Sequence, residues 1–323
     1  MSAAVTIRYD GPVLVLTGPT TSGKTDLSVE LARRRPIEII SMDSRQVYVG
    51  MDIGTDKVRA EHQAAIPHHG LDLVTPDQRY SAGQFARDAR RWIEEIRMRG
   101  ALPVVAGGTG FFLKSLLNPI FAEPDLDPER RERLRAWVAR QPRETLEAFV
   151  RVLDPPRAEM AIKGGPHRMA RTLEVALLTG VPLSRWHVVA PPEAPGVSAA
   201  VVVLDLPRKE IRRRIANRAE RMVERGLEDE VRGLLAAGHG DDAPGMTGTG
   251  YRETARYLRG ETTLEEAKEE IDSNTWKYAR RQLTWFRHQL PDHAVTIDAA
   301  QPVERQAEFA LHALDVQATE NSE

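Results

Sequence analysis

The stretch Gly18-Pro19-Thr20-Thr21-Ser22-Gly23-Lys24-Thr25 decides the fold of this chain. It matches the phosphate-binding loop pattern GxxxxGK[ST] at every fixed position. An apolar β-branched run, Pro12 to Thr17, precedes it, and a helical pattern, Asp26 to Arg35, follows it. Such a loop turns backbone N–H groups toward phosphate oxygens at the positive end of a helix. The motif therefore indicates a polyphosphate site, without saying which polyphosphate.

Every polar residue of this loop has an expected part in the binding of phosphate. Lys24 is expected to meet the terminal phosphate oxygens. The Thr25 hydroxyl is expected to bind Mg²⁺, which is the cofactor that the sequence predicts. The residues predicted to hold the phosphates are Gly18, Thr20, Thr21, Ser22, Gly23, Lys24 and Thr25.

Three further apolar runs indicate strands of the same sheet. Ile37 to Ser41 ends just before Asp43, Pro103 to Ala106 ends at a Gly-rich turn, and Val201 to Leu206 repeats the pattern later. The stretch from Ala82 to Arg99 has the spacing of a long amphipathic helix. Because strands alternate with helices, we predict an α/β fold with a parallel sheet.

The region between these strands has a different pattern. Residues 123–194 show helix signals but no convincing strand, and Pro191 to Gly196 is expected to be a linker. We therefore predict a discontinuous phosphate-loop core made of residues 1–122 and 195–323, with C-terminal helices. A helical insertion domain, residues 123–194, is predicted to interrupt it.

Composition excludes several kinds of site. The 323 residues include no cysteine, so disulfides, thiolate zinc sites and a cysteine nucleophile are excluded. No run approaches the about 18 apolar residues of a membrane span. Met1 to Asp10 lacks the basic start and apolar stretch of a signal peptide. We expect a cytoplasmic monomer with no membrane partner.

Charge is concentrated in two segments although the formal net charge is only −2. Arg208 to Arg225 holds eight Lys or Arg against three acids, and Trp276 to Gln289 holds four basic residues, no acid and several aromatic rings. Local basic segments of this kind suit nucleic acid. Charge alone leaves open whether the first segment binds an anion or is a solvated helix face.

Several further motifs are more specific than the phosphate loop. In chain order they are Asp43–Tyr48 (DSRQVY), Gly50–Thr55 (GMDIGT), Gly107–Gly110 (GGTG), Arg168–Val175 (RMARTLEV), Gly250–Arg252 (GYR) and Arg280–Arg287 (RRQLTWFR). Together they resemble the tRNA dimethylallyltransferase family, also called tRNA isopentenyltransferases, over roughly residues 12–288. Gly164-Gly165, Trp276 and Glu253 depart from the family pattern, and these departures concern local tRNA contacts rather than the reaction.

The resemblance implies a reaction. A dimethylallyl group moves from dimethylallyl pyrophosphate to N6 of the adenosine 3′-adjacent to the anticodon in tRNA, and pyrophosphate is released. The attacking amine must lose a proton, and the resemblance makes Asp43 the base that accepts it. Without the family, Asp43 could equally be a Mg²⁺ ligand or a loop cap. Within the pattern RIxxR, the resemblance places a pyrophosphate-binding arginine at Arg218, and Arg218 and Thr25 are predicted to act with Asp43 in catalysis.

The resemblance also assigns residues to the anticodon stem-loop of tRNA, whose target base must be flipped out of its stack. They are Asp43, Ser44, Arg45, Gln46, Thr109, Arg168, Arg171, Gly250, Tyr251, Arg252, Arg280, Arg281, Gln282, Trp285 and Arg287. For Trp285, stacking on a base and filling of the core remain equal alternatives. The adjacent His68 and His69 are interpreted as structural residues, because no third ligand has suitable spacing.

Three other classes of protein are alternatives. An adenine-nucleotide isopentenyltransferase would need neither the insertion nor the basic and aromatic segment. A small-molecule phosphate-loop kinase would bind ATP and transfer a phosphoryl group. A nucleotide-driven switch or RNA-binding module would couple hydrolysis to release of RNA.

Overall fold

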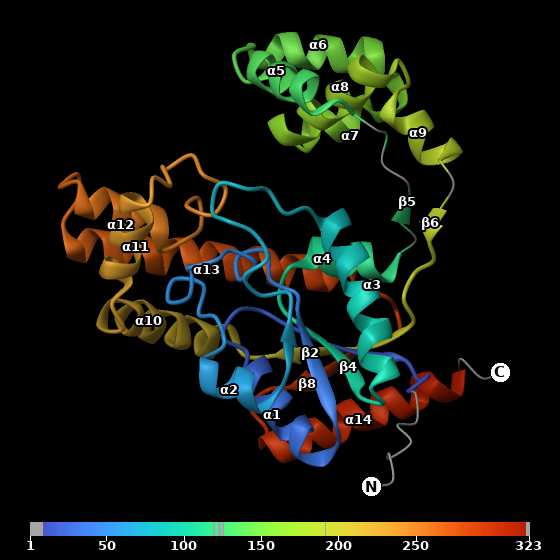
Figure 1. The fold of residues 1–323 in the computed structure, drawn as a ribbon, viewed down its shortest axis with the longest axis vertical. Coiled ribbons are helices and arrows are strands. Elements are labelled where there is room, and N and C mark those ends of the chain that lie inside the picture. Colours follow the sequence, from blue (N-terminus) through green and yellow to red (C-terminus); the bar gives the residue numbers. More distant parts are fainter. Residues whose placement is uncertain (1–8, 119, 122–123, 125, 191, 321–323) are drawn as a thin grey trace, which may run out of the picture. The chain divides into compact units, whose positions relative to one another are not determined.

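The computed structural model describes residues 9–118, 120–121, 124, 126–190 and 192–320, and it contains two compact units. The core unit comprises Met1–Asn118 and Gly196–Glu323, and the helical unit comprises Pro119–Pro195 (Figure 1). The predicted domain boundary at 122 and 123, the first linker residue Pro191 and most of the N-terminal segment 1–10 lie outside the described residues.

The core unit is built on a six-stranded sheet with the order β3-β2-β4-β1-β7-β8, in which every neighbouring pair is parallel. Its strands are β1 Val13–Thr17, β2 Ile37–Ser41, β3 His68–His69, β4 Leu102–Ala106, β7 Ala199–Asp205 and β8 Val295–Asp298. This confirms the predicted α/β fold class. No sequence pattern indicated β8, since only Ile297 of its four residues is buried.

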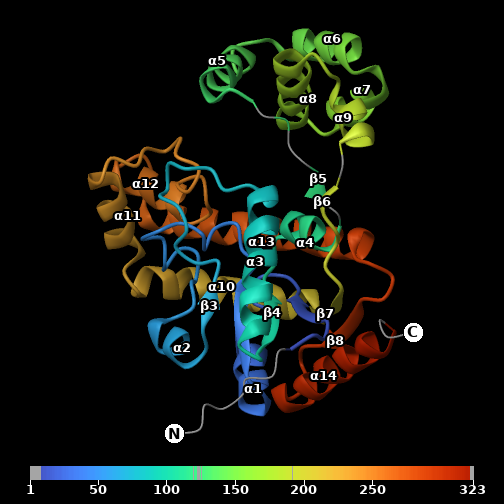
Figure 2. The same cartoon turned by 45° about the vertical axis from the view of Figure 1, so that its right-hand side comes forward.

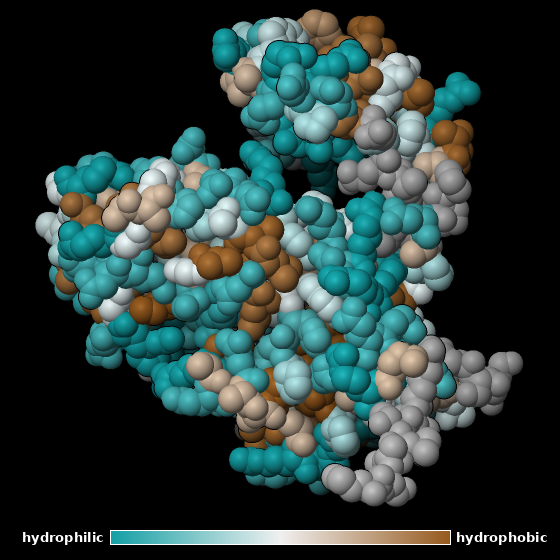
Figure 3. Space-filling model, viewed as in Figure 1, coloured by the Kyte–Doolittle hydropathy of each residue, from teal (hydrophilic) through white to brown (hydrophobic). Residues whose placement is uncertain are grey.

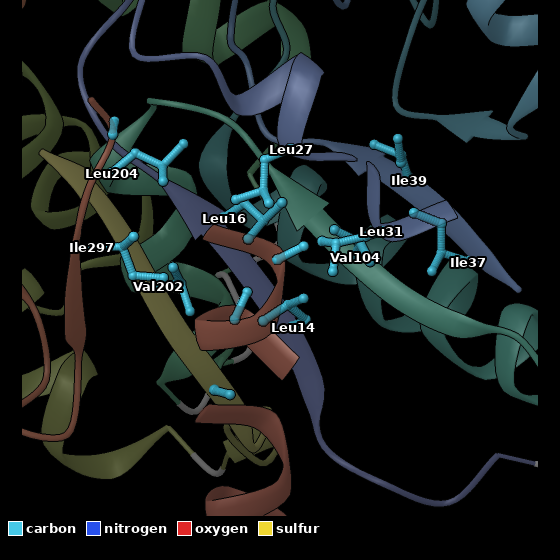
Figure 4. Close-up of a cluster of buried hydrophobic side chains, with 14 of the residues drawn as sticks. Leu14, Leu16, Leu27, Leu31, Ile37, Ile39, Val104, Val202, Leu204 and Ile297 are labelled. Carbon is cyan, nitrogen blue, oxygen red and sulfur yellow. The ribbon is translucent and has the colours of Figure 1, made fainter. Parts of the chain in front are cut away.

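Alternating side chains of β1 cover the two faces of the sheet with apolar surface. Leu14 and Leu16 belong to one buried cluster with residues of α1 and α14, and Val13 and Val15 belong to another with residues of α3 and α4. Each fully buried Leu stabilises the fold by about 1.5–3 kcal/mol. Figure 4 shows the first cluster around Leu14, Leu16 and Leu27. These helices are α1 Lys24–Arg34, α3 Ala82–Met98, α4 Gly110–Leu117 and α14 Val303–Glu320.

Local capping explains where two long helices of the core unit begin. At α3, the Ser81 hydroxyl accepts from the Gln84 N–H at 3.1 Å, and the Gln84 side chain accepts from the Ser81 N–H at 2.9 Å. Thr263 and Glu266 form the same reciprocal pair at the start of α13, Leu264–Gln289. Each cap satisfies two backbone donors that a helix end leaves free.

Further helices of the core unit connect strands of the sheet along the chain. They are α2 Ala60–Ala65, α10 Arg208–Glu224, α11 Leu227–Ala236 and α12 Tyr251–Leu258. A third buried cluster, which includes Met51, Leu227 and Tyr251, joins α11 and α12 to the loop after β2. Helix α13 contacts α10, α12 and α4, and Figure 2 shows it crossing the core unit.

The helical unit has its own small core. Its helices are α5 Pro128–Val138, α6 Arg143–Leu153, a 3₁₀ turn Pro155–Arg157, α7 Ala158–Lys163, α8 Pro166–Thr179 and α9 Leu183–Val189. Val150, Met169 and Leu173 are fully buried among them. The expectation of no strand within 123–194 was wrong for Pro192–Ala194 (β6), which pairs antiparallel with Ile120–Phe121 (β5). A strand of three residues is too short to show a period of two.

The described residues include no helix that is long and apolar enough to cross a membrane. Figure 3 shows that hydrophilic residues cover most of the visible face of the core unit.

Candidate active site

A cleft of about 850 Å³ lies in the core unit and brings together residues that are far apart in the chain. It is lined by Thr20–Thr25 after β1, Asp43–Gln46 after β2, Gly108 after β4, several arginines of α10, and Tyr278 of α13. The carboxyl ends of parallel strands share one edge of a sheet, and α/β proteins build their sites there. The predicted phosphate loop and the predicted base therefore face the same space.

Backbone conformation fixes the shape of the phosphate loop. Gly23 has a φ of 95°, and Gly18 has a φ of 146°. A Cβ at Gly18 would lie 2.6 Å from the backbone oxygen of Leu204, so only glycine fits against β7. Gly23 directly precedes α1, and the loop thus delivers its N–H groups to the start of that helix.

The ammonium group of Lys24 lies inside the loop. It donates to the backbone oxygens of Gly18 at 3.1 Å and Pro19 at 2.9 Å, and to the Ser22 hydroxyl at 3.3 Å. Burial lowers the pKa of Lys24 to about 8; the Asp43 carboxylate opposes this shift, and the Arg218 cation adds to it. Lys24 is therefore a cation whose charge depends on pH near neutrality.

The helical spacing of α10 selects which of its arginines reach the cleft. Residues three and four apart share a helix face, and Arg214, Arg218 and Arg221 line the cleft together with the adjacent Arg213. Arg218 donates to the Thr20 hydroxyl at 2.9 Å, and Arg214 donates to the Thr21 backbone oxygen at 3.0 Å. The Arg218 Nε is buried and has no hydrogen-bond partner among the described residues. A buried guanidinium donor with spare capacity at a phosphate loop suits an anionic ligand.

The Asp43 carboxylate has a local contact as well as a position in the cleft. Its Oδ1 accepts from the Arg45 N–H at 2.8 Å, which caps the turn after β2. A carboxylate has about four acceptor positions, so this cap leaves Asp43 able to accept a proton. Asp43 also borders a smaller cavity of about 100 Å³ that it shares with Lys24 and Thr25. The capping role is thus observed, and it is compatible with the predicted role as base.

The donor set beside the phosphate loop fits Mg²⁺. Thr25, Asp26 and Asp43 line the same cleft and offer hard oxygen atoms. Mg²⁺ commonly takes one or two protein oxygens and completes its shell with phosphate and water. Among the described residues no group of three or more His, Cys, Asp or Glu forms a metal site of its own. His68 Nδ1 instead contacts the Ile66 backbone oxygen, and His69 Nε2 contacts Glu38.

A polar wall borders Asp43 on the side of α13 and the Gly-rich turn. The Thr109 hydroxyl accepts from the Ser44 N–H at 3.0 Å. Burial, reinforced by the Asp43 charge, raises the pKa of Tyr278 to about 12, so this phenol stays neutral. Sequence reasoning missed Tyr278 as a site residue. Its place within the basic and aromatic segment was the only signal.

Arg45 and Gln46, both assigned to tRNA, make contacts within the protein. Arg45 donates to the Pro244 backbone oxygen at 2.8 Å and to the Thr247 hydroxyl at 3.2 Å. The Gln46 amide accepts from the Ser41 hydroxyl at 2.9 Å. Both residues line the cleft, and their contact with a nucleotide stays a prediction.

The carboxylate of Glu230, a residue outside the sequence motifs, holds residues 50–55 in place. Glu230 of α11 accepts from the N–H groups of Asp52 at 2.9 Å, Ile53 at 2.8 Å and Gly54 at 3.2 Å. It also accepts from the Tyr251 hydroxyl at 2.6 Å. Tyr251 is 1% exposed. The structure therefore gives Tyr251 a supporting role, and its contact with tRNA stays a prediction.

The GYR motif otherwise starts α12. Gly250 has a φ of 102°, and its N–H donates to the Glu253 carboxylate at 2.8 Å. The neighbouring Arg252 is exposed and lines the cleft. The Arg252 side chain can consequently face a ligand, and Tyr251 lines the same cleft.

Helix α13 has one face that packs against the protein and one face that is exposed to solvent. Gln282 is 6% exposed; its Oε1 accepts from the Thr20 N–H and its Nε2 donates to the Gly108 oxygen, both at 2.9 Å. Trp285 packs over Gly110, where a Cβ would overlap the indole ring. Trp285 is partly buried against the core, and its stacking on a base stays a prediction. The arginines of this segment, Arg280, Arg281 and Arg287, are exposed.

The two arginines predicted to contact tRNA from the insertion lie on α8 of the helical unit. Arg168 is exposed. Arg171 donates to Glu174 at 2.7 Å, and Glu174 also accepts from Arg131 and Arg135. Glu174 is only 3% exposed, so these pairs hold α5 against α8. Binding of tRNA by Arg168 and Arg171 stays a prediction.

The parallel sheet, the loop before α1 and the arginine-lined cleft define a phosphate-loop protein of the α/β class. Comparison with known proteins then narrows the class. The chain belongs to the IPP transferase family, whose model matches residues 46–289. A model described as isopentenyl transferase matches residues 11–65.

Individual relatives agree with this membership. A tRNA dimethylallyltransferase of Desulfotalea psychrophila is 44% identical over 275 residues, which is 85% of this chain and 88% of the relative. A tRNA dimethylallyltransferase of Thermomicrobium roseum is 43% identical over 277 residues, which is 85% of this chain and 83% of the relative. The predicted family and transferase class are therefore confirmed.

Solved structures agree as well. The tRNA isopentenylpyrophosphate transferase of Bacillus halodurans has a TM-score of 0.70 and 32% identity, with 97% of this chain and 100% of that chain covered. A eukaryotic dimethylallyltransferase acting on tRNA has a TM-score of 0.75 and 23% identity, with 97% and 78% covered, and shows the shared fold.

Proposed function

We propose that this protein transfers a dimethylallyl group from dimethylallyl pyrophosphate to N6 of the adenosine 3′-adjacent to the anticodon in tRNA. The observation that carries the proposal is one cleft in which a phosphate loop, a carboxylate and several arginines meet. The relatives named tRNA dimethylallyltransferase support the choice of substrates.

The protein's own residues account for each part of the reaction. N6 attacks C1 of the dimethylallyl group, the C1–O bond breaks, and the N6 proton passes to Asp43. Lys24 and the loop N–H groups hold the pyrophosphate, and Arg218 receives the charge that grows on it as it leaves. Tyr278 is neutral and lies beside Asp43 and Thr109, where it can orient the adenine by a hydrogen bond.

Thr25, with Asp26 beside it, would hold Mg²⁺, which would neutralise part of the pyrophosphate charge when bound. The assignment rests on the hard oxygen donors beside Lys24.

Exposed arginines supply the positive charge that a molecule of net charge −2 needs for tRNA. In the core unit these are Arg252, Arg280, Arg281 and Arg287, and in the helical unit Arg168 is exposed. The helical unit is proposed to bind tRNA together with the core unit. The protein is proposed to act as a monomer, and a tRNA substrate supports a cytoplasmic location.

Label transfer tests this function. The protein is incubated with dimethylallyl pyrophosphate labelled in its dimethylallyl group, Mg²⁺ and either tRNA or AMP, with no other nucleotide. We expect label in tRNA and none in AMP. Label in AMP would support the adenine-nucleotide alternative, and an absolute need for ATP hydrolysis would support a kinase or switch.

A further inference from the structure

Asp56 places a negative charge beside Arg218, which faces the phosphate loop, and beside Arg225. Its carboxylate lies 3.1 Å from Arg225 and 3.6 Å from Arg218. Asp56 lines the cleft and also the smaller cavity beside Lys24. It follows the motif of residues 50–55, and neither the motifs nor the proposed reaction uses it.

The backbone holds Asp56 in this place. Its φ is 54°, which is a left-handed conformation that aspartate, asparagine and glycine adopt more readily than other residues. The Asp56 N–H donates to the Ile53 oxygen at 3.1 Å, and the Gln46 amide donates to the Asp56 oxygen at 3.3 Å. Glu230 accepts from the N–H groups of residues 52–54, just before this turn. The position of the carboxylate is therefore set by the turn.

Arg218 is the cation for which Asp56 and pyrophosphate compete. Its side chain is 16% exposed and already contacts Thr20 of the phosphate loop. The cleft around Asp56 and Arg218 also holds the charged groups of Lys24, Asp43, Arg214 and Arg221. A pyrophosphate that reaches Arg218 must share it with a carboxylate of the same sign or displace that carboxylate. Either outcome weakens the binding of pyrophosphate.

We propose that Asp56 lowers the affinity of the cleft for pyrophosphate by pairing with Arg218. The proposal rests on the function proposed above. Lower affinity makes release of the pyrophosphate product faster. Faster release raises turnover where release rather than chemistry is rate-limiting, as it is in many enzymes. A substrate that also binds through its dimethylallyl group keeps contacts that the free product lacks.

Calorimetry of inorganic pyrophosphate binding tests the role of Asp56. The change Asp56→Asn removes the charge and keeps a residue that tolerates positive φ. Asp56 is 48% exposed, so its repulsion is screened, and we expect about fivefold to tenfold tighter binding of pyrophosphate. The effect should shrink as salt is added. The constant for product inhibition by pyrophosphate should fall by the same factor.

Asp77→Asn is the matched control, since it makes the same change in net charge. Asp77 pairs with His239 at 2.9 Å and does not line the cleft, so pyrophosphate affinity should stay at the wild-type value. Asp56→Gly is a second charge-free variant, which suits the same turn and should tighten binding as well if the asparagine variant folds poorly.

Three outcomes overturn the role of Asp56. They are unchanged binding in both Asp56 variants, weaker binding in both, and weaker binding only with Mg²⁺, which would make Asp56 a metal ligand. If the wild-type protein itself binds no pyrophosphate, the proposed function fails, and this result is distinct from the other three.

Discussion

Replacing Gln282 by leucine should damage the pyrophosphate site and not only the tRNA surface. The sequence assigned Gln282 to tRNA because it belongs to the RRQLTWFR motif. In the structure its amide connects the phosphate loop at Thr20 to the Gly-rich turn at Gly108. Leucine has a similar volume and neither donor nor acceptor, so Gln282→Leu breaks both connections without opening a cavity.

The expected loss of stability follows from the two backbone groups that Gln282→Leu leaves without a partner. The Gly108 oxygen bonds to a buried amide, and an unsatisfied buried acceptor costs about 1–3 kcal/mol. The Thr20 N–H is only partly buried, and water in the cleft can replace its bond, so about 1 kcal/mol is expected for it. We therefore expect a loss of about 2–4 kcal/mol in the free energy of unfolding, with a fall in Tm of about 2–4 °C per kcal/mol.

Two measurements check this prediction. Urea denaturation gives the free energy of unfolding, and calorimetry gives the affinity for pyrophosphate, which should weaken about tenfold, or about 1.4 kcal/mol, because Thr20 is no longer held. Gln289→Leu is the control, since Gln289 is an exposed glutamine of the same helix. Wild-type affinity for pyrophosphate in a folded Gln282→Leu variant, together with weaker tRNA binding, would refute this reasoning.

The remaining predictions concern the base, the tRNA surface and pH. Asp43→Asn should lower the single-turnover rate by about 10² to 10⁴, since a positioned base contributes that much. The affinity for tRNA should change less than about tenfold. Recovery of activity by added Mg²⁺ would instead identify Asp43 as a metal ligand. Replacing Arg281 and Arg287 by Ala should weaken tRNA binding and flatten its salt dependence, by about 0.7 to 0.9 in slope for each phosphate that the variant no longer neutralises; an unchanged slope in the folded variant would make both residues structural. Pyrophosphate binds the charged form of Lys24, whose pKa is about 8, so affinity should be full below pH 8 and fall above it. The Lys24→Met variant should lack this fall, and a wild-type curve parallel to that of the variant would contradict the pKa.

The sheet and the phosphate loop could be predicted because their signals are local. β2 lies at the predicted Ile37–Ser41, where three isoleucines stand within four residues. β8 and the pair β5 and β6 could not be predicted, because Val295–Asp298 has one buried residue and the other two strands have three residues or fewer. Pairing with a distant strand, rather than local pattern, makes them strands.

The site was predictable in part for the same reason. Asp43 and Arg218 were found through motifs, and the fold places both at the loop. Glu230 and Asp56 were not found. Their partners are backbone N–H groups or arginines far along the chain, and such contacts produce no recognisable spacing of residues in the sequence. The contact of Arg214 with the loop likewise could be seen only from the helix face that turns toward Thr20 and Thr21.

Mass spectrometry of tRNA nucleosides tests the central claim most directly. Unmodified tRNA is incubated with the protein, dimethylallyl pyrophosphate and Mg²⁺, then digested to nucleosides, and a parallel digest to oligonucleotides locates the modified base. The account predicts one adenosine that carries a dimethylallyl group on N6, placed 3′-adjacent to the anticodon, with an equal amount of pyrophosphate released. Unmodified tRNA after incubation with a folded protein that binds pyrophosphate would contradict it.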